Sequence, residues 1–159
     1  MNRLRIPIAL ISFVSAIGCG HSSFQATPSH PFPPGMDVLL ISHHGESVEL
    51  APFLAKSKLT IYDFYADWCS NCRIFDTHIG EYAAAHPTTI AYRKINIVDW
   101  ESPVALQFLK KIDQLPYGIV FTPNGERFHD ISGLDKVALF KLLDEASELR
   151  SPSNWMKIS

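Results

Sequence analysis

The sequence predicts an α/β domain with a mixed central β-sheet and helices on both of its faces. Runs rich in β-branched and aromatic residues alternate with amphipathic helical segments along the first part of the domain, and a β-hairpin followed by a helix comes last. Strands joined through helices are parallel and hairpin strands are antiparallel, so the sheet is expected to be mixed. The chain has 159 residues, enough for one such domain and an appendage.

The first half of the domain reads as strand, helix, strand and helix. An apolar run over residues 38–41 predicts a short strand, and residues 50–56 favour a short helix. Residues 59–65 are β-branched and aromatic, which is typical of a buried strand. After Cys72, apolar residues recur at spacings of three and four up to Ala83, which predicts an amphipathic helix that Pro87 ends.

The second half continues with a β-rich run over residues 88–97. Ser102 followed by Pro103 predicts a helix start, because proline in the first turn lacks only an N–H that has no partner there. Residues 117–122 and 127–131 flank a Pro-Asn-Gly turn and therefore predict a hairpin. An amphipathic helix over residues 134–149, capped near Asp135, completes the domain.

Residues 1–18 have the pattern of an export signal. Arg3 and Arg5 are followed by a mostly apolar run of about a dozen residues, which is short for a membrane span but typical of a signal-peptide core. Residues 15–19, Ser-Ala-Ile-Gly-Cys, resemble the bacterial lipobox, in which the residue after the cleavage site is a lipid-carrying cysteine. We therefore expect lipidation of Cys19. The alternative is an ordinary cleaved signal with an incidental cysteine.

The three cysteines agree with this interpretation. An odd number in an exported protein leaves one thiol to explain, and lipid on Cys19 leaves Cys69 and Cys72 as a self-contained pair. Residues 19–36 contain the lipidated cysteine and a Pro- and Ser-rich tether, residues 37–150 form the domain, and residues 151–159 form a tail. The expected location is the bacterial cell envelope, with the lipid in the membrane and the domain facing the periplasm or the exterior.

Composition argues against two classes of function. The formal net charge is −2, so there is no basic surplus to neutralise phosphates, and no nucleic acid is expected as a partner. His43 and His44 are adjacent, and we interpret them as polar loop residues. Spaced His and Cys pairs that could converge on a metal are missing from the sequence, and no cofactor is expected beyond a redox-active disulfide.

The Cys69-Ser70-Asn71-Cys72 segment lies between a predicted strand and a predicted helix. A thiolate at a helix N-terminus is stabilised by free N–H groups and by the helix dipole, and the thiolate is the species that attacks disulfides. Cys69 is therefore the predicted nucleophile, and Cys72, one turn later, the resolving thiol. A zinc ribbon would need a second ligand pair, and no cysteine follows Cys72. A purely structural disulfide of this spacing would close almost no loop.

Residues 63–72, Asp-Phe-Tyr-Ala-Asp-Trp-Cys-Ser-Asn-Cys, resemble the active-site segment of the thioredoxin family. They are especially similar to the C-terminal thioredoxin-like domain of bacterial transmembrane disulfide reductases. The likeness covers about residues 41–149 and includes Gln-Leu-Pro-Tyr-Gly at 114–118, Lys-Ile-Asn-Ile at 94–97, Asn-Gly-Glu at 124–126 and Gly133. The resemblance implies a thioredoxin fold and a thiol–disulfide oxidoreductase.

The resemblance also implies roles for individual residues. Asp63 corresponds to the family's buried acid, which exchanges a proton with the resolving thiol and is expected to have a raised pKa. Lys94 corresponds to the lysine that approaches this acid. Leu115 and Pro116 correspond to the cis-proline segment that lies against the disulfide and helps to bind the substrate backbone. Trp68 is expected to shield the nucleophile.

Some positions depart from the family pattern. Ser70 and Asn71 replace Gly-Pro, Thr77 replaces a frequent proline, Tyr117 replaces a frequent threonine, and residues 98–115 form a segment about three residues longer than usual. Neutral residues between the cysteines stabilise a thiolate little, which predicts a low reduction potential and reducing or shuttling behaviour. The expected partners are disulfides of exported proteins and an upstream electron donor.

Two other functions remain open from the sequence. One is a lipoprotein binding module that uses this fold without redox turnover. The other is a Cu(I) metallochaperone in which Cys69, Cys72 and His78 hold the metal. His78 lies six residues after Cys72, a spacing that points it away from the start of the helix.

Overall fold

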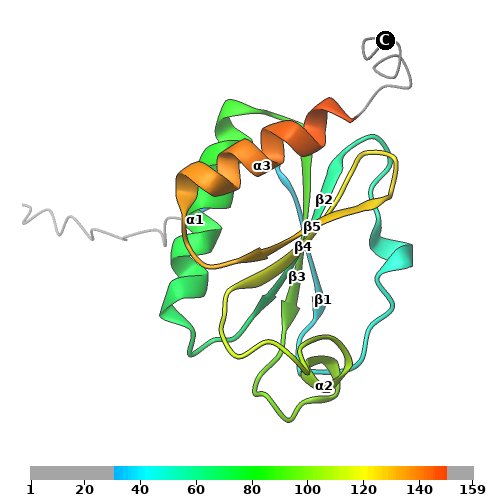
Figure 1. Cartoon of the computed structure of the whole chain (residues 1–159), viewed down its shortest axis with the longest axis vertical. Coiled ribbons are helices and arrows are strands. Elements are labelled where there is room, and N and C mark those ends of the chain that lie inside the picture. Colours follow the sequence, from blue (N-terminus) through cyan, green and yellow to red (C-terminus); the bar gives the residue numbers. More distant parts are fainter. Residues whose placement is uncertain (1–30, 150–159) are drawn as a thin grey trace, which may run out of the picture.

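Strand β2 lies at the centre of a five-stranded mixed sheet (Figure 1). The structure is a computed structural model that describes residues 31–149. The strand order is β1-β3-β2-β4-β5, with β1 and β3 parallel to β2 and with β4 antiparallel to both β2 and β5. The strands are β1 (Asp37–Ser42), β2 (Leu59–Tyr65), β3 (Ile90–Asn96), β4 (Tyr117–Phe121) and β5 (Arg127–Ser132). The predicted mixed sheet is confirmed.

Helices cover both faces of the sheet, as predicted. Helix α1 (Ser70–Ala85) and helix α3 (Lys136–Glu148) lie together on one face, and the 3₁₀ helix η1 (Ala51–Phe53) lies on the other (Figure 1). Helix α2 (Pro103–Phe108) packs into the same core as η1, at the end of the sheet. The cysteines belong to the core that contains η1 and α2. Helices α1 and α3 bury most of their apolar side chains in a separate core, on their own face of the sheet.

Two elements are shorter than the sequence predicts. The helix expected over residues 50–56 is a single 3₁₀ turn, because Leu54 takes an extended conformation and ends it. The strand expected from residue 88 begins at Ile90, because Thr88 has a left-handed φ of 67° and belongs to the preceding turn. The strands and helices elsewhere lie within two residues of the predicted limits, except that α2 is only six residues long.

Residues 31–36, which we call the N-terminal strap, lie against α1 and lead directly into β1. Phe32 and Met36 are half-buried and pack on the core beneath α1. These six residues belong to the segment predicted as a tether, and they have a defined place on the domain. Cys19, the rest of the tether and the tail at 151–159 lie outside the described residues.

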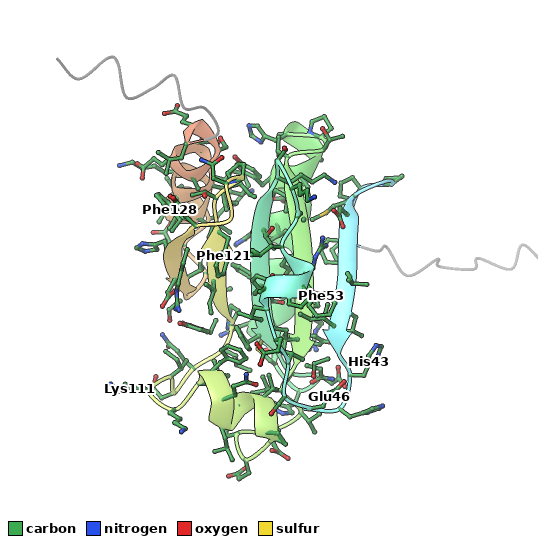
Figure 2. The ribbon with its side chains drawn as sticks, turned by 90° about the vertical axis from the view of Figure 1, so that its right-hand side faces the viewer. His43, Glu46, Phe53, Lys111, Phe121 and Phe128 are labelled. Carbon is green, nitrogen blue, oxygen red and sulfur yellow. A yellow bond between two sulfur atoms is a disulfide. The ribbon has the colours of Figure 1, made fainter. Side chains whose placement is uncertain are left out.

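The loop after β1 carries the adjacent histidines. Both are exposed, and their backbone N–H groups donate to the carboxylate of Glu46, at 3.1 Å for His43 and 2.7 Å for His44. Figure 2 labels His43 and Glu46 on this loop. They are loop residues, as predicted. Within residues 31–149, none of the helices combines the length and the apolar character needed to cross a membrane.

Candidate active site

The topology places the cysteine pair at the carboxyl end of the central strand. After β2 the chain reaches Cys69, which is the N-cap of α1. The Sγ atom of Cys69 accepts a hydrogen bond of 3.1 Å from the Cys72 N–H. The two cysteines form a disulfide with a Cα–Cα distance of 5.4 Å. Cys69 is 6% exposed and Cys72 only 2%. Cys69 is therefore the cysteine whose sulfur a partner protein can reach more easily.

The segment before β4 comes to the same end of the sheet. Because β4 is antiparallel to β2 and Tyr117 pairs with Phe64, the residues just before Tyr117 lie near the end of β2. The Leu115–Pro116 peptide bond is cis. A cavity of about 280 Å³ opens beside the disulfide, lined by Trp68, Cys69, Ser70, Asn71, Trp100, Asp113, Gln114 and Leu115.

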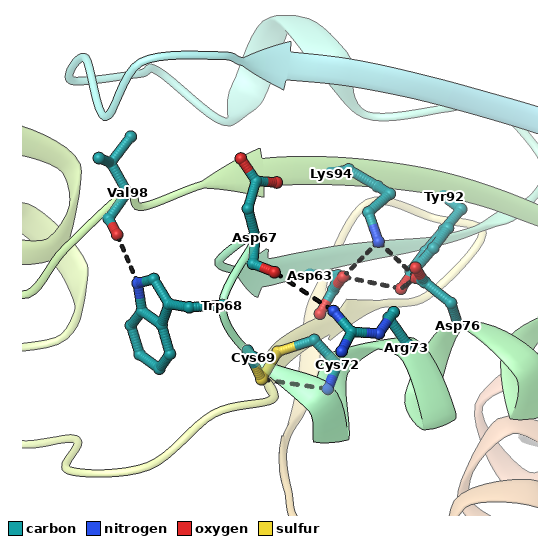
Figure 3. Close-up of a disulfide and its surroundings, with 10 residues drawn as sticks. All are labelled: Asp63, Asp67, Trp68, Cys69, Cys72, Arg73, Asp76, Tyr92, Lys94 and Val98. Carbon is teal, nitrogen blue, oxygen red and sulfur yellow. Dashed lines mark hydrogen bonds and ion pairs between the residues drawn. A yellow bond between two sulfur atoms is a disulfide. The ribbon is translucent and has the colours of Figure 1, made fainter.

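Trp68 is fixed by its polar end and remains open to solvent on its ring. Its indole N–H donates to the Val98 carbonyl at 2.7 Å, while 57% of the residue is exposed (Figure 3). The Trp100 ring lies 6.5 Å from the Trp68 ring, centroid to centroid. The two tryptophans thus give the cavity an aromatic wall next to Cys69.

A buried ionic network lies on the sheet side of α1. Asp63 is fully buried, and its Oδ2 accepts from the Tyr92 hydroxyl at 2.8 Å and lies 3.2 Å from Lys94 Nζ. Lys94 is the register partner of Asp63 on β3, so the sheet pairing itself brings acid and amine together. In the view of Figure 3, the Asp63 carboxylate lies between the disulfide and Lys94.

A second acid completes the network. Asp76, one turn after Cys72 on α1, forms an ion pair with Lys94 and accepts a hydrogen bond from Tyr92 at 2.8 Å. A hydroxyl has a single hydrogen, so Tyr92 can donate to one of the two carboxyl groups at a time. The geometry therefore couples the two carboxyl groups through one shared hydroxyl and one shared ammonium group.

Burial sets the protonation of Asp63. Desolvation raises the pKa of Asp63 to about 6; the Lys94 ammonium opposes this rise and the Asp76 carboxylate adds to it. Burial also raises the pKa of Tyr92 well above its ordinary value, so its hydroxyl stays protonated. Asp63 Oδ1 is buried without a hydrogen-bond partner among the described residues. A carboxyl with a free oxygen and a pKa near neutrality can accept and release a proton at physiological pH.

The comparisons with known proteins agree with this geometry. A family model described as Thioredoxin matches residues 45–145. The chain belongs to the thioredoxin family. It is 29% identical to a thioredoxin of Mycoplasma pneumoniae over 97 residues, which cover 61% of this chain and 91% of that protein. It is likewise 29% identical over 92 residues to thioredoxin-T of Drosophila melanogaster, which cover 58% of this chain and 56% of that protein.

Solved thioredoxin structures share the fold. A mutant thioredoxin from Halobacterium salinarum matches with a TM-score of 0.51 and 25% identity, over 70% of this chain and 91% of that one. Thioredoxin f2 of Chlamydomonas reinhardtii matches with a TM-score of 0.52 and 18% identity, over 69% and 96%. The predicted thioredoxin fold and the thiol–disulfide oxidoreductase class are confirmed.

Thioredoxins need no cofactor beyond their redox-active disulfide, as expected for this chain. The structure does not bring His78 together with the cysteines as a metal site: within residues 31–149, no group of three His, Cys, Asp or Glu side chains is placed to hold an ion. His78 instead lies along α1, half-buried.

The structure gathers the residues singled out from the sequence at one end of the sheet: Asp63, Trp68, Cys69, Cys72, Lys94, Leu115 and Pro116. Sequence reasoning missed Asp76 and Tyr92. Asp76 stands among apolar residues on the inward face of a predicted amphipathic helix, and Tyr92 is two residues before Lys94 on the same strand face. An acid on an apolar helix face was the signal that could have identified Asp76.

Proposed function

We propose that this protein is a lipid-anchored, extracytoplasmic member of the thioredoxin family that reduces or shuttles disulfides of exported proteins. The observation that carries the proposal is the placement of the Cys69–Cys72 pair at the N-terminus of α1, with the buried Asp63 beside it. Export and anchoring rest on the basic and apolar residues before Cys19.

The proposed reaction starts from the reduced pair. The Cys69 thiolate attacks one sulfur of a substrate disulfide, and the other sulfur leaves as a thiolate that takes a proton from water. Cys72 then gives its thiol proton to Asp63 and attacks Cys69 Sγ in the mixed disulfide, which releases the second substrate sulfur. The substrate gains two electrons and the pair becomes the Cys69–Cys72 disulfide. An upstream dithiol donor restores the reduced pair by the reverse exchange.

The direction of transfer follows from electrostatics. The strong oxidant of the periplasm has a potential of about −120 mV because its reduced form is stabilised, whereas thioredoxin has about −270 mV. Ser70 and Asn71 are neutral and exposed, so they add no charge that would favour the Cys69 thiolate. We therefore propose a potential nearer that of thioredoxin.

Equilibration of the full chain in thiol buffers of known potential, followed by alkylation, measures this directly. A potential near −120 mV would reverse the direction to disulfide donation. A Cys72→Ser variant should trap mixed disulfides through Cys69 in cells, with Cys69→Ser/Cys72→Ser as the matched control. If the trap stays empty and the pair never cycles, a binding module without redox turnover takes the place of this proposal.

Anchoring has its own test. Growth with a labelled fatty acid should label the wild-type chain, and Cys19→Ser should lose both the label and the association with the membrane fraction. Cys69→Ser serves as the control that removes a cysteine and keeps the label. Loss of the signal segment without lipid on the wild-type chain would indicate an ordinary cleaved signal.

A further inference from the structure

The N-terminal strap has a built conformation. Residues 33–36 form a tight turn in which the Met36 N–H donates to the Pro33 carbonyl at 3.2 Å. Pro34 occupies the second position, and Gly35, with φ +81°, the third, as a type II turn requires. The turn fixes the direction in which the residues before it leave β1, so the strap lies along α1.

Helix α1 is shaped to receive the strap. Gly80 is buried within the helix, and a Cβ added there would overlap the Pro31 carbonyl oxygen. Glycine destabilises a helix interior relative to alanine, so a glycine at this position allows the close approach of the strap at a cost to the helix. Gly80 is one turn after Asp76, which places the contact next to the ionic network.

The strap covers that network with an aromatic ring. Phe32 packs edge-on against Tyr92, with 5.4 Å between ring centroids, and Lys94 Nζ lies 6.0 Å from the Phe32 centroid. Phe32 belongs to the apolar cluster that surrounds Tyr92 beneath α1. Its ring therefore fills space that water would otherwise share with the polar ends of Tyr92 and Lys94.

We propose that Phe32 is a positioning residue that keeps water away from the proton relay of the active site. It does so on the side of the network that the strap covers. The inference rests on the relay role proposed for Asp63. It concerns exclusion of water, since a phenyl ring supplies neither charge nor proton. The titratable groups that face Asp63 come from β2, β3 and α1: Tyr65, Tyr92, Lys94, Asp76 and the thiol of Cys72 in the reduced form.

The test is the titration of Asp63 in the full chain, followed by NMR of ¹³C-labelled aspartate carboxyl groups. Burial is the main cause of the raised pKa of Asp63, so Phe32→Ala should move its midpoint down by about one pH unit, toward the ordinary value. Phe32→Leu, which keeps an apolar side chain in place, should have an Asp63 midpoint close to that of the wild type. An unchanged midpoint in Phe32→Ala overturns the proposal.

Two further variants control the result. Phe128→Ala removes a half-buried phenyl group from the same core at β5, the edge strand opposite β1, and should leave the titration unchanged (Figure 2). Gly80→Ala favours the helix but blocks the strap, so it should lower the midpoint with Phe32 intact. A wild-type midpoint in Gly80→Ala would contradict docking of the strap as the cause.

The proposed role of Asp63 as a proton relay and the proposed role of Phe32 can be disproved separately. If Asp63→Asn resolves a mixed disulfide at the wild-type rate, the relay is wrong whatever Phe32 does to the titration. If Asp63→Asn is slow but Phe32→Ala titrates and resolves like the wild type, the relay stands and the role of Phe32 is wrong.

Discussion

At the scale of single residues, Asp63 is unfavourable for folding above weakly acidic pH. Burial raises its pKa in the folded protein to about 6, while the unfolded chain ionises near 3.8. Between these values the folded state binds the proton and the unfolded state has lost it, so stability falls as the pH rises from about 4 to about 6. The difference corresponds to about 3 kcal/mol, which stays lost at higher pH.

Asp63→Asn should therefore stabilise the oxidised protein and slow its chemistry. We expect the free energy of unfolding at pH 7 to rise by about 1–3 kcal/mol, measured with urea, and the fall between pH 4 and pH 6 to flatten. Resolution of a mixed disulfide on Cys69 should slow by about 100-fold, since the proton acceptor is gone. Glu49→Gln, at an exposed position that does not line the cavity beside the disulfide, is the control. A less stable Asp63→Asn with the wild-type pH dependence would contradict the burial argument.

Asp76 should tune Asp63 rather than replace it. The Asp76 carboxylate raises the pKa of Asp63, and its removal also leaves Lys94 to pair with Asp63 alone. Both effects act in the same direction, so Asp76→Asn should lower the Asp63 midpoint, as read from carboxyl NMR. A midpoint that rises instead would show that the two acids are not coupled through Lys94.

At the scale of elements, α1 begins at the residue that performs the chemistry. Cys69 caps the helix through its sulfur, which accepts the Cys72 N–H. Serine is a good N-cap and alanine a poor one, so the reduced Cys69→Ala variant should be about 1 kcal/mol less stable than reduced Cys69→Ser. Urea denaturation in the presence of reductant measures this. Equal stabilities would mean that a hydrogen-bond acceptor in the side chain at position 69 contributes nothing as a cap.

Elements with local signals were predictable from the sequence. Ser102 and Asp135 each accept a backbone N–H three residues on, as N-caps do, and both were identified from residue type and position. The strap was not predictable, because Pro- and Ser-rich composition indicates a spacer and says nothing about docking. Its place on the domain depends on Gly80, a residue almost fifty positions later whose role only the tertiary structure reveals.

The residues of the candidate site also differ in whether a local sequence signal identifies them. Cys69 and Cys72 follow from the chemistry of one short segment, and Asp63, Lys94 and Pro116 from resemblance to a family. Asp76 and Tyr92 belong to the network through a contact between a helix and a strand sixteen residues apart, which periodicity cannot show. Tyr92 reads as an ordinary core aromatic until the sheet register sets its hydroxyl between two carboxyl groups.

At the scale of the whole molecule, the redox state and the stability of the fold are linked. A pair with a low reduction potential is one whose disulfide is stabilised by the fold relative to its dithiol. We therefore expect the oxidised protein to unfold at higher urea than the reduced protein. Each 30 mV by which folding lowers the potential of the pair corresponds to about 1.4 kcal/mol of this difference. A more stable reduced form would make the protein an oxidant.

The two edge strands of the sheet affect how readily the domain associates with itself at high concentration. Strand β5 carries the Arg127–Asp130 ion pair, and its pairing with β4 is interrupted by a register shift. Strand β1 is also irregular, between Leu40 and Ser42, and Asp37 at its start is held by Lys58 and Arg93. Bulged and charged edges are poor templates for sheets of neighbouring molecules. We therefore expect the domain to resist fibril-like self-association even where many copies are crowded together.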